Sequence, residues 1–139
     1  MSEEALKSEF DAAIARYESG EAASTLIPTF ESLCDRFHND AMWTCLAWLY
    51  LLDGKAEKAL RAAKVAVKAN PTDAQARVNL SLAMLETGAK GVRNEIEAVK
   101  QIVARDTELR DIVKNNLDEG QKRRKDWQFI TRVQAWLRE

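Results

Sequence analysis

Apolar residues recur along the chain at the three- to four-residue spacing of amphipathic helices, and the alternating β-branched runs that strands need are absent. Ala, Leu, Glu, Lys and Arg, which favour helix, occupy most positions, whereas Gly and Pro are few. The pattern therefore predicts an all-α protein with about eight helices. We expect these helices to span residues 3–18, 24–37, 40–53, 56–69, 73–87, 90–104, 107–117 and 121–138.

A repeat organises this helical pattern. Three glycines, each suited to a helix end, stand 34 residues apart at Gly20, Gly54 and Gly88. A small residue precedes each glycine by seven positions, at Ala13, Ala47 and Ser81. Small residues at a fixed place let paired helices approach closely. A repeat of this length with two helices per unit predicts a solenoid of helical hairpins.

The middle unit, residues 40–73, resembles a tetratricopeptide repeat (TPR). The resemblance rests on Trp43-x-x-Leu46-Ala47-x-x-Tyr50 followed by Gly54, Ala59, Ala63, Ala66 and Pro71. At Ala63 the family usually has an aromatic residue. The flanking units, residues 6–39 and 74–106, are degenerate versions of the same pattern. The resemblance implies one domain over residues 1–139, built as a right-handed superhelix of helical hairpins, with C-terminal helices over 107–139 that include a capping helix.

A concave groove follows from the resemblance, because the first helix of each TPR lines the inner surface of the array. The segment 40–53 is apolar nearly all round, so both of its faces need covering. The predicted groove residues are Phe10, Ile14, Tyr17, Trp48, Leu51, Leu52, Val78, Asn79, Leu82 and Leu85. Such a surface favours an apolar or amphipathic segment, with Asn79 bonding the backbone of that ligand.

The last predicted helix carries one strongly apolar face. Its apolar residues are Trp127, Phe129, Ile130, Val133, Trp136 and Leu137. Three interpretations stand side by side for this segment. It caps the open end of the solenoid, it fills the concave groove of its own chain, or it docks onto a partner or a second copy.

Charge is unevenly distributed. Residues 1–40 hold nine acids and three bases, whereas residues 120–139 hold six bases and two acids. The compact basic run Lys122, Arg123, Arg124 and Lys125 is expected in the first turn of the last helix. It is either a solvated turn or a contact for nucleic acid or anionic lipid. The net charge of −1 argues against a globally basic nucleic-acid binder, so a nucleic-acid partner is not expected.

Residues suited to catalysis or metal binding are sparse. The chain has one histidine, His38, and two cysteines, Cys34 and Cys45, without a recognisable motif around them. We therefore expect no enzyme, no cofactor and no metal site. The TPR site that grips chaperone tails needs fixed cations, but Lys7 is followed a turn later by Asp11, so we exclude that role. No apolar run reaches membrane-spanning length and no signal peptide is visible, which predicts a cytoplasmic protein.

The leading hypothesis is a protein-interaction module, either an adaptor or an assembly chaperone, that binds a partner segment in the groove. One alternative is a self-associating structural protein that uses its C-terminal helix to form a homodimer. Another is an accessory factor that contacts nucleic acid or anionic membrane through residues 122–125. The identity of the partner does not follow from the sequence, because a fold does not fix a function.

Overall fold

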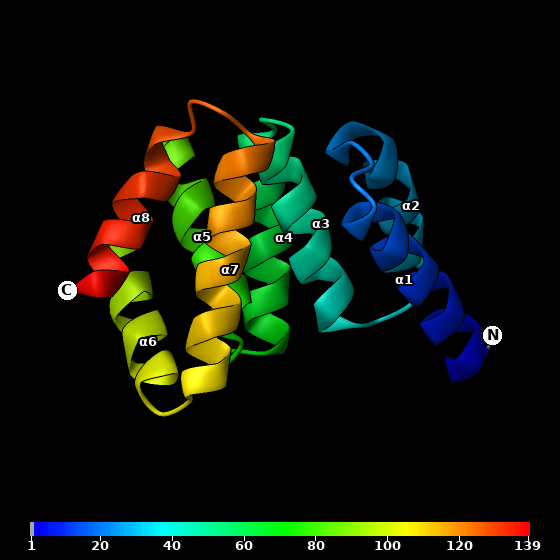
Figure 1. Ribbon diagram of the computed structural model, residues 1–139. Coiled ribbons are helices and arrows are strands. Elements are labelled where there is room, and N and C mark those ends of the chain that lie inside the picture. Colours follow the sequence, from blue (N-terminus) through cyan, green and yellow to red (C-terminus); the bar gives the residue numbers. More distant parts are fainter. Residues whose placement is uncertain (1) are drawn as a thin grey trace.

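The computed structural model describes residues 2–139, and within that range the chain forms helices and no strands (Figure 1). The eight helices are α1 (Glu3–Glu18), α2 (Ala23–Arg36), α3 (Asp40–Leu52), α4 (Ala56–Ala69), α5 (Ala74–Thr87), α6 (Val92–Ala104), α7 (Thr107–Arg123) and α8 (Gln128–Arg138). The prediction of an all-α fold with about eight helices is confirmed.

Local sequence explains where several helices begin and end. Asn39 and Asp73 accept hydrogen bonds from the first free backbone N–H groups of α3 and α5. Gly88 ends α5 in the left-handed conformation, with φ of 74°, which a residue bearing a side chain rarely adopts. These caps keep the first six helices within two residues of their predicted bounds.

The last two helices differ from the prediction. We expected a break after residue 117 and a new helix from residue 121, but α7 continues to Arg123 and α8 begins at Gln128. Gly120 lies inside α7 and is buried. The actual break follows at Asp126, whose φ of 64° reverses the chain. The basic run thus occupies the end of α7 and the following loop rather than the first turn of the last helix.

Helices adjacent in sequence pack against each other from α1 to α6, and α3 also packs directly on α5. Small buried residues, among them Ala47, Ala59 and Ala63, allow this close approach. The missing aromatic at Ala63 is thereby explained, since its methyl group has no exposed surface. The two termini lie at opposite ends of the molecule (Figure 1). This arrangement is the stacked-hairpin architecture that the repeat predicted.

The C-terminal pair of helices, α7 and α8, contacts several helices of the stack and not only its neighbours in sequence. Helix α8 contacts α5, α6 and α7, and α7 in turn contacts α5 and α6. At the other end of the stack, α1 packs on α2 but makes little close contact with α3. The concave side of the first helices is therefore covered near α5 and less tightly closed near α1. None of the helices described is both long and apolar enough to cross a bilayer.

Candidate functional site

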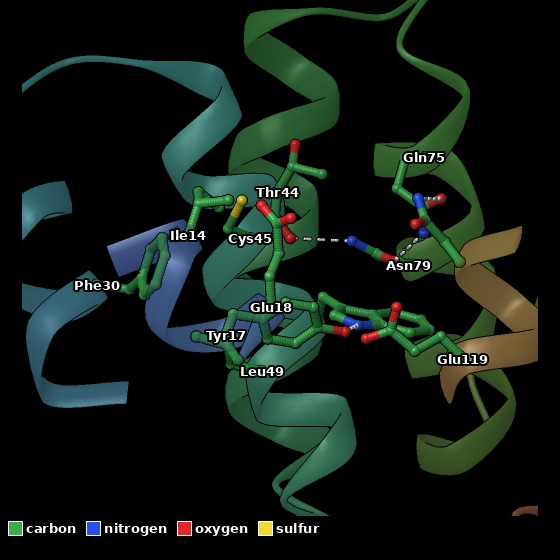
Figure 2. A pocket seen from close by; sticks show the side chains of 12 residues that line it. Ile14, Tyr17, Glu18, Phe30, Thr44, Cys45, Leu49, Gln75, Asn79 and Glu119 are labelled. Carbon is green, nitrogen blue, oxygen red and sulfur yellow. Dashed lines mark hydrogen bonds between the residues drawn. The ribbon is translucent and has the colours of Figure 1, made fainter. Parts of the chain in front are cut away.

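A cavity of about 380 Å³ opens on the concave side, between α1, α3, α5 and α7. Figure 2 shows its side chains converging from these helices. The cavity is lined by Ile14, Tyr17, Glu18, Phe30, Thr44, Cys45, Trp48, Leu49, Gln75, Asn79, Asn116 and Glu119. Four of these residues belong to the predicted groove, namely Ile14, Tyr17, Trp48 and Asn79. The cavity is the part of the predicted concave surface that remains open.

Apolar side chains dominate the part of the cavity nearest α1. Ile14 and Cys45 are partly exposed there, and they lie above the buried side chains of Leu49 and Phe30. Phe10 does not line the cavity, because its ring packs edge-on against Phe30 with 6.1 Å between ring centroids. A partner side chain entering here would meet carbon and sulfur atoms, and its burial would drive binding.

The cavity is closed at one end by aromatic rings and an arginine. Trp48 donates a hydrogen bond from Nε1 to the hydroxyl of Tyr17 at 2.9 Å. Trp127, in the loop before α8, packs on Trp48 with 5.6 Å between ring centroids. The Arg123 guanidinium lies 3.7 Å from the centre of the Tyr17 ring and bonds Glu119 at 2.8 Å. Burial raises the pKa of Tyr17 to about 12.

A chain of amide hydrogen bonds forms the wall between α5 and α7. Asn116 donates to Gln75 at 3.0 Å, Gln75 donates to Asn79 at 2.9 Å, and Asn79 donates to the Thr44 carbonyl at 3.0 Å. Asn79 is fully buried. Its predicted role as a partner for a ligand backbone needs revision, because its carboxamide already joins α3 to α5.

The rest of the predicted groove is covered by the chain itself. Leu51, Val78 and Leu82 have no exposed surface, and they share one core with Leu117 and Trp127 from the C-terminal segment. Two further groove residues, Leu52 and Leu85, are half-buried against the same core. A partner cannot reach Leu51, Val78 or Leu82 while α7 and α8 stay in place.

The apolar face of α8 is directed into its own molecule. Ile130 and Val133 are fully buried, and Trp127 is nearly so. The remaining predicted members, Phe129, Trp136 and Leu137, are partly buried. Helix α8 packs on α5, α6 and α7 of its own chain, at the C-terminal end of the stack, as the capping interpretation expects. A homodimer that needs the buried face of α8 has no free surface for it.

Two residues of the basic run contact other parts of the chain, and the other two are exposed. Arg123 also donates to the backbone carbonyls of Tyr17 and Glu21, which ties α7 to the end of α1. Arg124 pairs with Glu86 at 2.7 Å, donates to the Leu51 carbonyl and covers the ring of Trp127. Lys122 and Lys125 are exposed. An anionic partner would therefore meet two free lysines, not four free cations.

Neither cysteine has the lowered pKa of a reactive thiol. Burial raises the pKa of the Cys45 thiol to about 12, and burial does the same for Cys34. Both thiols therefore stay protonated at neutral pH, whereas a nucleophilic cysteine needs a lowered pKa. His38 is exposed in the loop before α3. Across residues 2–139, no cluster of three or more His, Cys, Asp or Glu side chains could hold a metal ion.

The sequence did not identify the contribution of α7 to the site. Asn116 and Glu119 line the cavity, and Gly120 allows the approach of α7 to α3. A Cβ atom on Gly120 would lie 2.6 Å from Cη2 of Trp48, which is too close for any side chain. The one available signal was a glycine within a helical pattern, in the gap that we expected between helices 107–117 and 121–138.

Comparison with known structures supports the fold. PcrH from Pseudomonas aeruginosa matches with a TM-score of 0.71 and 14% identity, over 88% of this chain and 94% of that chain. The type III secretion translocator chaperone SycD from Yersinia enterocolitica matches with a TM-score of 0.69 and 14% identity, over 87% and 91% of the two chains. A second SycD structure, an alternative dimer, gives 0.68 and 16% over 89% and 97%.

No protein-family model and no curated protein matches the sequence. The structural likeness extends over most of each chain, whereas the sequence identity is low. The likeness therefore shows the fold alone, and it confirms the prediction of a TPR-like array of helical hairpins.

Proposed function

We propose that this protein is a non-enzymatic binding module that holds an apolar or amphipathic segment of a partner protein in the open part of its concave groove. The observation that carries the proposal is the cavity of about 380 Å³ between α1, α3, α5 and α7, with its apolar floor around Ile14 and Leu49. Six of its twelve lining residues are polar or charged, and a cavity of this volume that combines apolar and polar groups suits specific recognition.

The structural neighbours bear on the kind of binding role that we propose. SycD is described as a translocator chaperone of type III secretion. A chaperone with a TPR-like fold keeps a partner segment covered, and an apolar groove suits that task. By analogy, we propose that this chain is an adaptor or assembly chaperone.

Ile14 is the best position for testing the groove, because it lines the cavity and is not fully buried. Ile14→Glu places a charge on the apolar floor. Ala12 is exposed and lies on the opposite side of α1, so Ala12→Glu adds the same charge outside the groove. Trp48→Glu is unsuitable, because Trp48 packs on Trp127 and bonds Tyr17, so its loss would damage the fold.

The experiment captures partners with tagged full-length protein from extract of its own source, with elution in rising salt and identification of what elutes. We expect a discrete protein that is retained at high salt by the wild type and by Ala12→Glu, and that Ile14→Glu loses by at least about tenfold. Equal capture by both variants, or capture of nothing but nucleic acid released at low salt, would refute the groove as the binding site.

A further inference from the structure

A stripe of unpaired cations runs along the outer side of α4, away from the groove. Lys58, Arg61, Lys64 and Lys68 are all exposed. Within residues 2–139, none of these four takes part in an ion pair. Their spacing of three, three and four residues places them along one side of the helix, over a length of about 15 Å. Glu57 is the one acid of α4, so the row keeps an excess of positive charge that attracts a ligand of opposite charge.

An apolar hollow lies beside this stripe. It has a volume of about 320 Å³ and is lined by Trp43, Leu46, Tyr50, Lys58, Arg61, Ala62 and Val65. Val65 is 42% exposed, so its side chain can be reached by a ligand that enters the hollow. The hollow uses the opposite face of α3 from Trp48, so a ligand here and a ligand in the groove do not compete for the same side chains.

We propose that this outer surface docks an acidic helical segment of a partner protein, with one large apolar side chain in the hollow and carboxylates along the stripe. Carboxylates three and four residues apart on a helix would match the spacing of the cations on α4. Each exposed pair contributes little by itself, but a row of pairs increases the association rate and fixes the orientation. The apolar side chain adds the burial that a purely ionic contact lacks.

A nucleic acid fits this surface less well. Stacking of bases needs open aromatic faces. Of the two aromatic residues at the hollow, Tyr50 is buried with its hydroxyl bonded to Glu31, and Trp43 is partly buried. Two carboxylates, Asp53 and Glu57, bound the stripe at the start of α4 and would repel a continuing phosphate backbone. The stripe therefore has the length of a short acidic helix and not of an extended polyanion.

The test measures binding of a fluorescein-labelled helical peptide of roughly 14 residues to the full chain by anisotropy. The peptide carries glutamates three and four residues apart and one central leucine. A second peptide has glutamine at every glutamate position, and an oligothymidylate of equal charge represents nucleic acid. The variant Arg61→Gln/Lys68→Gln removes two charges of the stripe. Lys90→Gln/Lys125→Gln removes two exposed charges elsewhere and serves as the matched control.

We expect the wild type and the control to bind the glutamate peptide equally, and Arg61→Gln/Lys68→Gln to bind it roughly fivefold to tenfold more weakly. Val65→Ser should weaken binding about threefold through the hollow. Ile14→Glu should leave this binding unchanged, so the failure of one proposal does not imply failure of the other. The proposal is overturned if the glutamate peptide does not bind, or if the glutamine peptide binds equally well. It is also overturned if the control variant loses as much affinity as Arg61→Gln/Lys68→Gln, or if the oligothymidylate binds more tightly than the glutamate peptide.

Discussion

Ile14, Trp48 and Leu82 stand 34 residues apart, so they occupy equivalent positions in the first helices α1, α3 and α5. Their surroundings differ in a regular way. Ile14 is partly exposed at the cavity, Trp48 is 8% exposed, and Leu82 is fully buried. Asp11, Cys45 and Asn79 form a second such series and follow the same order from exposed to buried. Burial along the concave face increases toward the C-terminal end.

The difference comes from what lies over each position and not from the repeat itself. Near α5 the C-terminal pair α7 and α8 supplies the covering layer, and Trp127 packs on Trp48 at its edge. Near α1 the cover is partial, because α7 contacts only the end of α1 through Arg123 and Tyr17, and the cavity remains beside this contact. Equivalent positions in a repeat array can therefore act as core at one end and as binding surface at the other. The following predictions test this division.

Trp127→Ala should produce the largest effect, because it removes the ring that seals the covered half. Trp127 is 3% exposed, and truncation of a buried aromatic side chain destabilises a domain by about 3–5 kcal/mol. The measurement is the free energy of unfolding from denaturant titration followed by circular dichroism. Trp136→Ala, in the partly buried part of α8, is the matched control and should lower stability clearly less. Equal losses in the two variants would contradict the role of Trp127 as the seal.

Gly120→Ala should have an intermediate effect, with a sign opposite to that expected from helix propensity. Alanine favours a helix over glycine by about 1 kcal/mol, but its Cβ would lie 2.6 Å from the Trp48 ring. Overpacking of a rigid contact costs about 1–3 kcal/mol, so we expect a net loss of about 1 kcal/mol. Asn115→Ala, at an exposed site of the same helix, should instead be neutral or slightly stabilising. A rise in the melting temperature of Gly120→Ala would show that α7 does not press against Trp48.

The repeat spacing and the helical pattern were sufficient to predict the first six helices and the hairpin array. The end of α7 was not predictable in the same way. Gly120 followed by a basic run has the local composition of a helix end, but contact with Trp48 keeps the helix continuous. A tertiary contact thus overrides a local signal, and local rules carry no information about which distant side chain will require a glycine.

The same distinction separates the residues of the candidate site that were predicted from those that were not. Ile14, Tyr17 and Trp48 were predicted from the repeat, and they line the cavity. Asn116 and Glu119 were not predicted, because they enter the site only when α7 lies against α5. The positions supplied by a repeated helix follow from its period, whereas those supplied by a non-repeated segment depend on how that segment packs.

Tyr17→Phe should have a small effect at neutral pH, similar in size to that of Gly120→Ala, and a distinctive dependence on pH. The phenylalanine lacks the oxygen that accepts the Trp48 hydrogen bond, so the variant should lose about 1 kcal/mol at pH 7. In the wild type, burial raises the pKa of Tyr17 to about 12, above its ordinary value near 10. The unfolded chain therefore releases this proton before the folded chain does, and the stability that Tyr17 contributes falls as the pH rises from about 10 to about 12.

The variant has no such group at position 17, so the difference in unfolding free energy between wild type and Tyr17→Phe should narrow as the pH rises from about 10 to about 12. Tyr50→Phe is the control on the other face of α3, because burial and the bond to Glu31 also raise the pKa of Tyr50. Denaturant titrations of the three proteins at several pH values make the comparison. If the difference in unfolding free energy between wild type and Tyr17→Phe stays constant with pH, the Tyr17 hydroxyl is open to water. The end of the cavity formed by Tyr17, Trp48 and Arg123 would then not be closed.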